Sequence, residues 1–195
     1  MATLAIAAEP DAEVMRRVQA GDEMGFAVLL HRYRTPLIRF LYRMVQNQAV
    51  AEELAQDVFL RVYRARKNYQ ATAKVSTWLF CIATRRALNW RRDVRKEQGN
   101  ESLDGDARER PLHQISDRKP TVEQILVCRT TADEIRSAVL ALSAKQRAAV
   151  ILHKYHGMEY SEIAASLKCS ESAVKSVLFR AYENLRRDLA HLAAN

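Results

Sequence analysis

The sequence predicts an all-α protein made of two small helical domains joined by an acidic linker. Only 5 Gly and 4 Pro interrupt 195 residues, while Ala, Leu, Arg and Glu, which lose little conformational entropy in a helix, are abundant. Apolar residues recur at helical spacing over residues 11–96 and again after Pro120. Between these stretches the periodicity weakens. Because a domain needs only about 50 residues or more, the chain is long enough for two.

We expect the first domain over residues 1–97, the linker over 98–120 and the second domain over 121–195. In the first domain the helical pattern breaks at Gly21, before Pro36 and around Asn47, which predicts three or four packed helices. Residues 97–134 carry nine acids against five bases. Four helix-disfavouring residues fall in or beside the linker: Gly99, Gly105, Pro111 and Pro120.

The overall charge favours a polyanionic partner. The formal net charge is +8 and the pI about 9.6, although a merely basic surface would give the same values. The chain has neither a secretion signal nor an apolar run of roughly 18 residues, so we expect a cytoplasmic protein without membrane insertion. The cysteines, Cys81, Cys128 and Cys169, are odd in number and far apart, which argues against disulfides and a zinc site.

The carboxy-terminal part predicts a helix-turn-helix. Ser143 and Gln146 form a possible capping box for a helix that stops at Gly157. A short helix over residues 160–167, a turn at 168–169 and the N-cap Ser170 then precede a second helix that reaches about Leu189.

The second of these helices has two distinct faces. Val174, Leu178, Ala181 and Leu185 form an inward stripe. The other face carries two cations, a hydroxyl and an aromatic ring, namely Lys175, Ser176, Phe179 and Arg180. Such a face suits a major groove, whereas a plain helical hairpin with a solvated face is the alternative.

A predicted helix over residues 50–68 also has two faces. Leu54, Val58, Val62 and Ala65 belong to the core. The opposite face groups acids and an amide around a leucine: Glu53, Gln56, Asp57, Leu60 and Arg64. Taken alone, it equally fits a solvated surface.

A loop over residues 68–75 follows, with Tyr69, Gln70, Thr72 and Lys74, and a helix begins at Ser76. On this helix Arg85, Asn89, Arg92 and Lys96 form one stripe, and residues 74–96 contain seven bases and a single acid. A basic helix beside an aromatic loop suits capture of single-stranded DNA. The alternative is that the arginines form a soluble surface and both Trp78 and Trp90 are core, which we expect for Trp78 in either case.

Several motifs together resemble the extracytoplasmic-function sigma factors of bacterial RNA polymerase. Gly157, Tyr160, Glu162-Ile-Ala164, Leu167, Ser170, Val174-Lys175-Ser176 and Leu178-Phe-Arg-Ala181 look like sigma region four. The string of residues 51–60 is similar to the segment that grips the polymerase clamp helices. Thr77-Trp-Leu79 and Ile82-Ala83 resemble the promoter-melting segment, and Gln19-Ala-Gly-Asp22 resembles the first turn of the family.

This resemblance implies a non-catalytic initiation factor without a cofactor, whose partners are core RNA polymerase, duplex and single-stranded promoter DNA, and an anti-sigma factor. It assigns polymerase binding to Glu53, Gln56, Asp57, Leu60 and Arg64. It assigns minus-ten DNA to Tyr69, Gln70, Thr72, Lys74, Arg85, Asn89, Arg92 and Lys96. It assigns minus-thirty-five DNA to Ser172, Lys175, Ser176, Phe179 and Arg180. Ser143, Val177 and Cys81 depart from residues that are common in the family.

Three rival functions make different demands on the sequence. A self-sufficient helix-turn-helix regulator would bind an operator as a dimer, without polymerase. A nuclease or phosphotransferase would need a phosphate loop, paired carboxylates or an activated nucleophile, and the sequence offers no such constellation. A pure protein adaptor would not need the basic helix.

Overall fold

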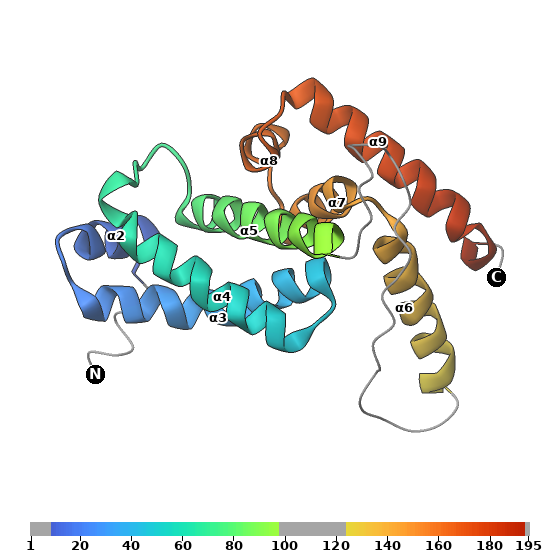
Figure 1. Cartoon of the computed structure of the whole chain (residues 1–195), viewed down its shortest axis with the longest axis horizontal. Coiled ribbons are helices and arrows are strands. Elements are labelled where there is room, and N and C mark those ends of the chain that lie inside the picture. Colours follow the sequence, from blue (N-terminus) through green and yellow to red (C-terminus); the bar gives the residue numbers. More distant parts are fainter. Residues whose placement is uncertain (1–8, 98–123, 194–195) are drawn as a thin grey trace. The chain divides into compact units, whose positions relative to one another are not determined.

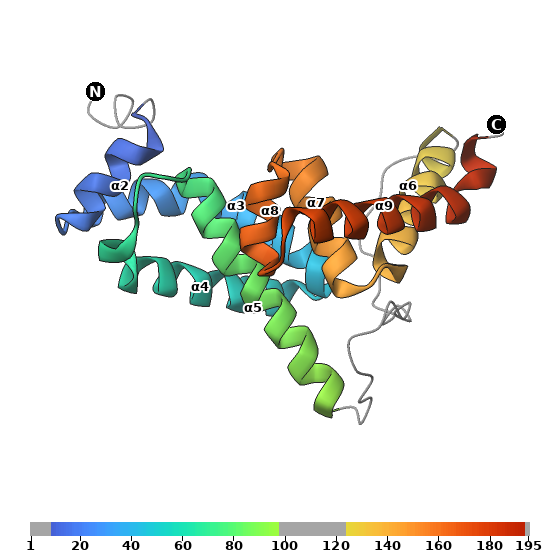
Figure 2. The same cartoon turned by 90° about the horizontal axis from the view of Figure 1, so that it is seen from above.

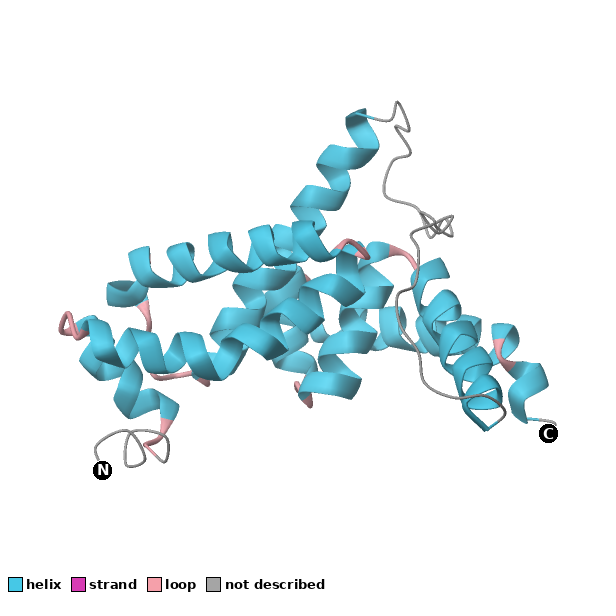
Figure 3. Ribbon diagram, turned by 90° about the horizontal axis from the view of Figure 1, so that it is seen from below, coloured by secondary structure: helices cyan, strands magenta, loops and turns pink. Residues whose placement is uncertain are grey.

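The computed structural model describes residues 9–97 and 124–193, and within these ranges all regular structure is helical (Figure 3). The chain divides into two compact units, the first built from helices α2 to α4, most of α5 and the end of α8, and the second mainly from the other helices between α6 and the short helix η2. The prediction of an all-α protein is confirmed. The predicted linker, 98–120, lies outside the described residues, and its boundaries stay a prediction.

In the first unit, α3 (Glu23–Val45) and α4 (Gln48–Arg64) pack side by side (Figure 1). The break predicted around Asn47 is the turn between them. Gln46 ends α3 in the left-handed conformation, and the Asn47 side chain caps α4 by accepting from the Val50 N–H at 3.1 Å. Of the predicted inward stripe, Leu54, Val58 and Val62 are buried, whereas Ala65 lies at the end of α4 and is half-buried.

One predicted break is wrong, because α3 continues through Pro36. Proline removes a backbone donor and disfavours a helix interior. Here Pro36 is exposed, while Leu29 before it and Leu37 and Phe40 after it are buried. Burial of apolar residues on both sides of Pro36 therefore outweighs the local cost.

Helix α2 (Asp11–Gln19) packs against α3, and the turn between them follows the predicted break at Gly21. Gly21 has φ +100°, a conformation that favours glycine. The Asp22 side chain then caps α3 by accepting from the N–H groups of Met24 and Gly25, at 2.9 and 3.1 Å.

Helix α5 (Val75–Glu97) completes the first unit, after a short 3₁₀ helix, η1 (Arg66–Asn68). Its Phe80 ring meets the Phe40 ring of α3 edge to face, with centroids 5.4 Å apart. Near its other end, the Arg91 guanidinium donates to the carbonyl of Met44 at 2.9 Å. These contacts fix which side of α5 faces away from the unit.

The remaining helices, which belong to the second unit except for the end of α8, are α6 (Gln124–Ala141), α7 (Ala144–His156), α8 (Tyr160–Leu167), α9 (Glu171–Asp188) and η2 (Ala190–Ala193). Helix α9 runs along α7 and also contacts α6 (Figure 2). The capping box of Ser143 and Gln146 is present, and Gly157 ends α7 in the left-handed conformation with φ 59°. Both predicted helix signals are thus confirmed.

The predicted helix-turn-helix corresponds to α8 and α9. Lys168 turns the chain with φ 53°, and the Ser170 hydroxyl accepts from the Ala173 N–H at 3.2 Å at the start of α9. Of the inward stripe, Val174, Leu178 and Ala181 are buried and Leu185 is half-buried. Across residues 9–97 and 124–193, the helices are too short or too polar to span a membrane.

Candidate nucleic-acid and protein-binding surfaces

The predicted DNA-reading face lies on the outer side of α9. We call it the recognition face, and all of its residues are exposed: Ser172, Lys175, Ser176, Phe179 and Arg180. The Phe179 side chain is 67 % exposed. Contact with water is unfavourable for an exposed phenylalanine ring, so burial of this ring against a partner would be favourable.

Local contacts hold the polar members of the recognition face. The Ser176 hydroxyl donates to the Ser172 carbonyl at 3.1 Å, and the Arg180 Nε donates to the Ser176 carbonyl at 3.4 Å. Arg180 is exposed on this face, and arginine is the side chain that makes a bidentate contact to guanine in a major groove. A phenylalanine beside it can contact a thymine methyl group.

A second cationic surface lies on α5. Its predicted stripe is exposed throughout, and we call it the basic stripe: Arg85, Asn89, Arg92 and Lys96. Two other bases of this helix are used within the first unit, since Arg91 bonds Met44 and Arg86 forms an ion pair with Asp57 of α4. The sequence did not separate these two arginines from the exposed ones.

The loop between α4 and α5 presents only part of its predicted set. Gln70, Thr72 and Lys74 are exposed. Tyr69 is 6 % exposed, so its ring is buried in the first unit, and its assignment to minus-ten DNA stays a prediction. Its hydroxyl donates to the Ala73 carbonyl at 2.6 Å, and its ring meets Trp78 with centroids 5.2 Å apart. Burial raises the pKa of Tyr69, so its hydroxyl stays a donor at neutral pH.

The predicted polymerase-binding face lies on α4. Glu53, Gln56, Leu60 and Arg64 are exposed, and the Leu60 side chain is 54 % exposed. Asp57 differs, because its carboxylate is half-buried and forms ion pairs with Arg61, at 2.9 Å, and with Arg86. Burial raises the pKa of Asp57, but the bond from Arg61 and the charge of Arg86 outweigh it and hold this pKa below its usual range.

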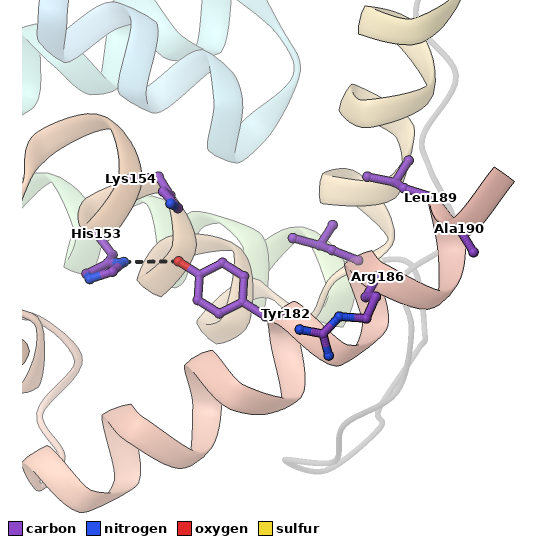
Figure 4. Close-up of a pocket in the computed structure, with 7 residues that line it drawn as sticks. His153, Lys154, Tyr182, Arg186, Leu189 and Ala190 are labelled. Carbon is purple, nitrogen blue, oxygen red and sulfur yellow. Dashed lines mark hydrogen bonds between the residues drawn. The ribbon is translucent and has the colours of Figure 1, made fainter. Parts of the chain in front are cut away.

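The structure also contains a groove in the second unit that sequence reasoning missed (Figure 4). It has a volume of about 690 Å³ and is lined by His153, Lys154, Tyr182, Leu185, Arg186, Leu189 and Ala190. At one end His153 Nδ1 lies 3.0 Å from the Tyr182 hydroxyl. Leu185 and Leu189 line it together with the cations Lys154 and Arg186, so a segment with apolar and acidic side chains would fit. Leu185 and Leu189 continue the inward stripe of α9 beyond Ala181, and this continuation was the signal available in the sequence.

Two family models match the chain, in the units that carry these surfaces. Sigma-70 region 2 matches residues 29–97, which include the face on α4, the loop and the basic stripe. Sigma-70 region 4 matches residues 132–185, which include the recognition face. Together they cover more than half of the chain. The chain therefore belongs to the sigma-70 family, the promoter-specificity factors of bacterial RNA polymerase.

Relatives of similar length place the chain within the extracytoplasmic-function (ECF) type of that family. It is 28 % identical to the RNA polymerase sigma-H factor of Pseudomonas aeruginosa, over 94 % of this chain and 96 % of that protein. It is 29 % identical to the ECF RNA polymerase sigma-E factor of Escherichia coli, over 89 % and 91 %. Its fold resembles that of the Bartonella quintana sigma factor RpoE, solved in complex with the anti-sigma factor NepR, with TM-score 0.62, 22 % identity, and 85 % and 96 % coverage.

Proposed function

We propose that this chain is an ECF sigma factor that binds core RNA polymerase and directs initiation at promoters with a particular minus-thirty-five and minus-ten element. The observation that carries this function is the presence of both family regions in one chain, each with an exposed face that carries basic side chains. A sigma factor needs both, because the duplex element and the melted element differ in chemistry.

The residue roles within this function are as follows. The recognition face enters the major groove of the minus-thirty-five element, where Arg180 and Lys175 read base edges and Phe179 contacts a methyl group. The basic stripe binds phosphates of the melted strand, and Gln70, Thr72 and Lys74 contact its bases. Glu53, Gln56, Leu60 and Arg64 contact the polymerase, while Asp57 contributes by orienting that surface.

The organisation of the chain follows from these roles. Residues 1–97 form the polymerase-binding and minus-ten domain, 98–120 the linker, and 121–195 the minus-thirty-five domain. We place the protein in the cytoplasm, where promoter DNA is, and expect no catalytic reaction of its own. The reaction belongs to the polymerase.

Reconstituted transcription tests this function directly. The full chain, mixed with core polymerase and a promoter library randomised at both elements, should enrich one pair of elements. The Arg180→Ala variant should lose discrimination at one minus-thirty-five position, by about 1 to 3 kcal/mol for a bidentate contact. Equal losses on all sequences would reassign Arg180 to phosphate binding. Tight operator binding by the chain without polymerase, together with failure to initiate, would support the rival helix-turn-helix regulator.

We further propose that an anti-sigma factor holds the chain inactive, as NepR binds the similar RpoE. The groove of α7 and α9 suits such a partner, because Leu185 and Leu189 offer apolar surface and Lys154 and Arg186 offer positive charge. Replacing Lys154 and Arg186 by glutamate should release the partner while leaving the recognition face intact. Unchanged binding of the partner would exclude the groove.

A further inference from the structure

We propose that helix α2 fixes the conformation of the loop of residues 69–74, and that Gln19 acts there as a positioning residue for minus-ten recognition. This inference rests on the proposed role of Gln70, Thr72 and Lys74 and deepens it, because it names what holds those side chains in place. The family model for region 2 begins at residue 29, so α2 precedes the matched region.

The carboxyl end of α2 is bonded to the start of the loop. The Gln19 side-chain amide donates to the Tyr69 carbonyl at 2.8 Å, across fifty positions of sequence. That carbonyl belongs to the peptide group that leads into Gln70. Fixing its direction restricts rotation of this peptide and therefore the direction in which the Gln70 side chain leaves the backbone.

The Tyr69 ring gives the loop a buried anchor. It lies in a core cluster with Val14, Met15 and Val18 of α2, together with Leu29 and Val75. From this anchor its hydroxyl reaches the Ala73 carbonyl at 2.6 Å. The hydrogen bond closes residues 69–73 into a compact turn, from which Gln70 and Thr72 point outward as exposed residues.

The amino end of α2 is connected to the other end of the loop. Asp11 forms an ion pair with Arg32 at 2.5 Å and accepts a hydrogen bond from the Tyr33 hydroxyl. At this end of the loop Val75, the first residue of α5, lies in the same core cluster as Val14 and Met15 of α2. Burial raises the pKa of Tyr33, which keeps the hydroxyl protonated at neutral pH. Helix α2 therefore holds the loop at both of its ends.

These contacts make a specific prediction about promoter choice. If the loop reads bases, then loosening its start spreads Gln70 and Thr72 over several directions and weakens discrimination between bases. Contacts made by α9 and the affinity for polymerase are not affected. Loss of a single neutral hydrogen bond should reduce the discrimination between bases at the minus-ten element by roughly threefold to tenfold.

The test uses the full chain assembled with core polymerase, and the variant Gln19→Glu. Glutamate keeps the size of the side chain but cannot donate to the Tyr69 carbonyl at neutral pH. The matched control is Gln48→Glu, since the Gln48 amide also makes one hydrogen bond, to Glu52 at the exposed start of α4. Two promoter libraries are transcribed, one randomised at the minus-ten element and one at the minus-thirty-five element, and thermal unfolding is followed by circular dichroism.

We expect Gln19→Glu to reduce minus-ten preference by roughly threefold to tenfold, with unchanged minus-thirty-five preference and a melting temperature like that of the Gln48→Glu control. An unchanged minus-ten preference overturns the inference. A uniform loss on every sequence also overturns it, because it would make Gln19 a structural residue only. The variants Gln70→Ala, Thr72→Ala and Lys74→Ala test the proposed role of the loop separately. If they leave minus-ten preference intact, the loop does not read bases. If they reduce it and Gln19→Glu does not, only the role of Gln19 is wrong.

Discussion

A buried guanidinium joins two helices of the second unit. The Arg147 side chain is 1 % exposed, and it donates to the carbonyls of Val139, Leu140 and Leu142, with 3.2 Å to the first and the last. Those carbonyls lie at or just beyond the end of α6, where helical partners run out, although the Val139 carbonyl also accepts from the Leu142 N–H at 3.3 Å. Burial lowers the pKa of Arg147 to about 10, so the side chain remains charged at neutral pH.

Removing this guanidinium should destabilise the second unit. Arg147→Met keeps the apolar stem and removes the guanidinium donors to the Leu140 and Leu142 carbonyls, so we expect the free energy of unfolding to fall by roughly 2 to 4 kcal/mol. Chemical denaturation followed by circular dichroism measures the change. Arg186→Met is the control, since its side chain is 74 % exposed, and it should change stability by less than about 0.5 kcal/mol. Equal stability of the two variants would refute the role of Arg147.

Asp57 and Glu53 share one face of α4 but should respond differently to charge reversal. Glu53→Lys should weaken polymerase binding without changing stability, since Glu53 is exposed. Asp57→Lys should weaken binding and also destabilise the fold by about 1 to 2 kcal/mol, because it places a third cation against Arg61 and Arg86. Polymerase affinity by fluorescence anisotropy and unfolding by circular dichroism separate the two effects. An Asp57→Lys variant with unchanged stability would contradict this assignment.

The same ion pairs make stability depend on pH. The pKa of Asp57 is lowered in the folded state, so its contribution is present above the ordinary carboxylate pKa of about 4 and is lost as pH falls through the lower folded value. The Asp57→Asn variant should therefore lose stability relative to the parent at neutral pH, and the difference should shrink below about pH 4. Denaturation curves across this range give the comparison.

At the scale of elements, helix ends were predictable wherever a local hydrogen bond or a left-handed residue sets them. The capping box at Ser143, the stop at Gly157 and the N-cap Ser170 are each decided within a few residues. The continuation of α3 through Pro36 was not predictable in this way. It depends on the burial of Leu29 and Leu37 against other helices, and a local pattern does not contain that contact.

The candidate surfaces were predictable to the extent that helical spacing defines them. Spacing separated Val174 and Leu178 from the recognition face, because both faces belong to one regular helix. It did not show that Tyr69 turns inward, since a loop has no period and an aromatic ring suits either side. The hydrogen bond from Gln19 to Tyr69 joins residues fifty positions apart, so no local sequence pattern predicts it.

The basic stripe of α5 predicts a measurable dependence on salt. Each phosphate contact releases condensed counterions, so Arg92→Ala should lower the slope of log affinity against log salt by roughly 0.7 to 1 for single-stranded minus-ten DNA bound to the polymerase complex. Arg16→Ala is the control, because the Arg16 side chain on α2 is 65 % exposed and that of Arg92 is 63 % exposed. Filter binding over a range of salt concentrations gives both slopes. An unchanged slope for Arg92→Ala would exclude a phosphate contact.

For the whole molecule, promoter selection depends on two surfaces carried by two separate units. The recognition face belongs to the second unit, and Arg85, Asn89 and Arg92 of the basic stripe belong to the first. Neither surface alone has the contacts of a tight, specific site, and their joint use on one polymerase multiplies two modest preferences. In the proposed function, different promoter elements are therefore read by residues on different helices, α9 and α5.

If the recognition face and the basic stripe act independently, the free-energy losses caused by variants on the two surfaces should add. Variants at sites without shared partners usually combine within about 0.5 kcal/mol, whereas neighbouring residues on one face interact by up to about 3 kcal/mol. We therefore expect Arg180→Ala combined with Arg92→Ala to lower open-complex formation by the sum of the two free-energy changes. Phe179→Ala combined with Arg180→Ala should deviate from its sum, since both residues lie on the recognition face. Open complexes are counted by permanganate footprinting at a promoter that carries both elements. Strong coupling between Arg180 and Arg92, as large as that between Phe179 and Arg180, would mean that the two units read the promoter as one surface.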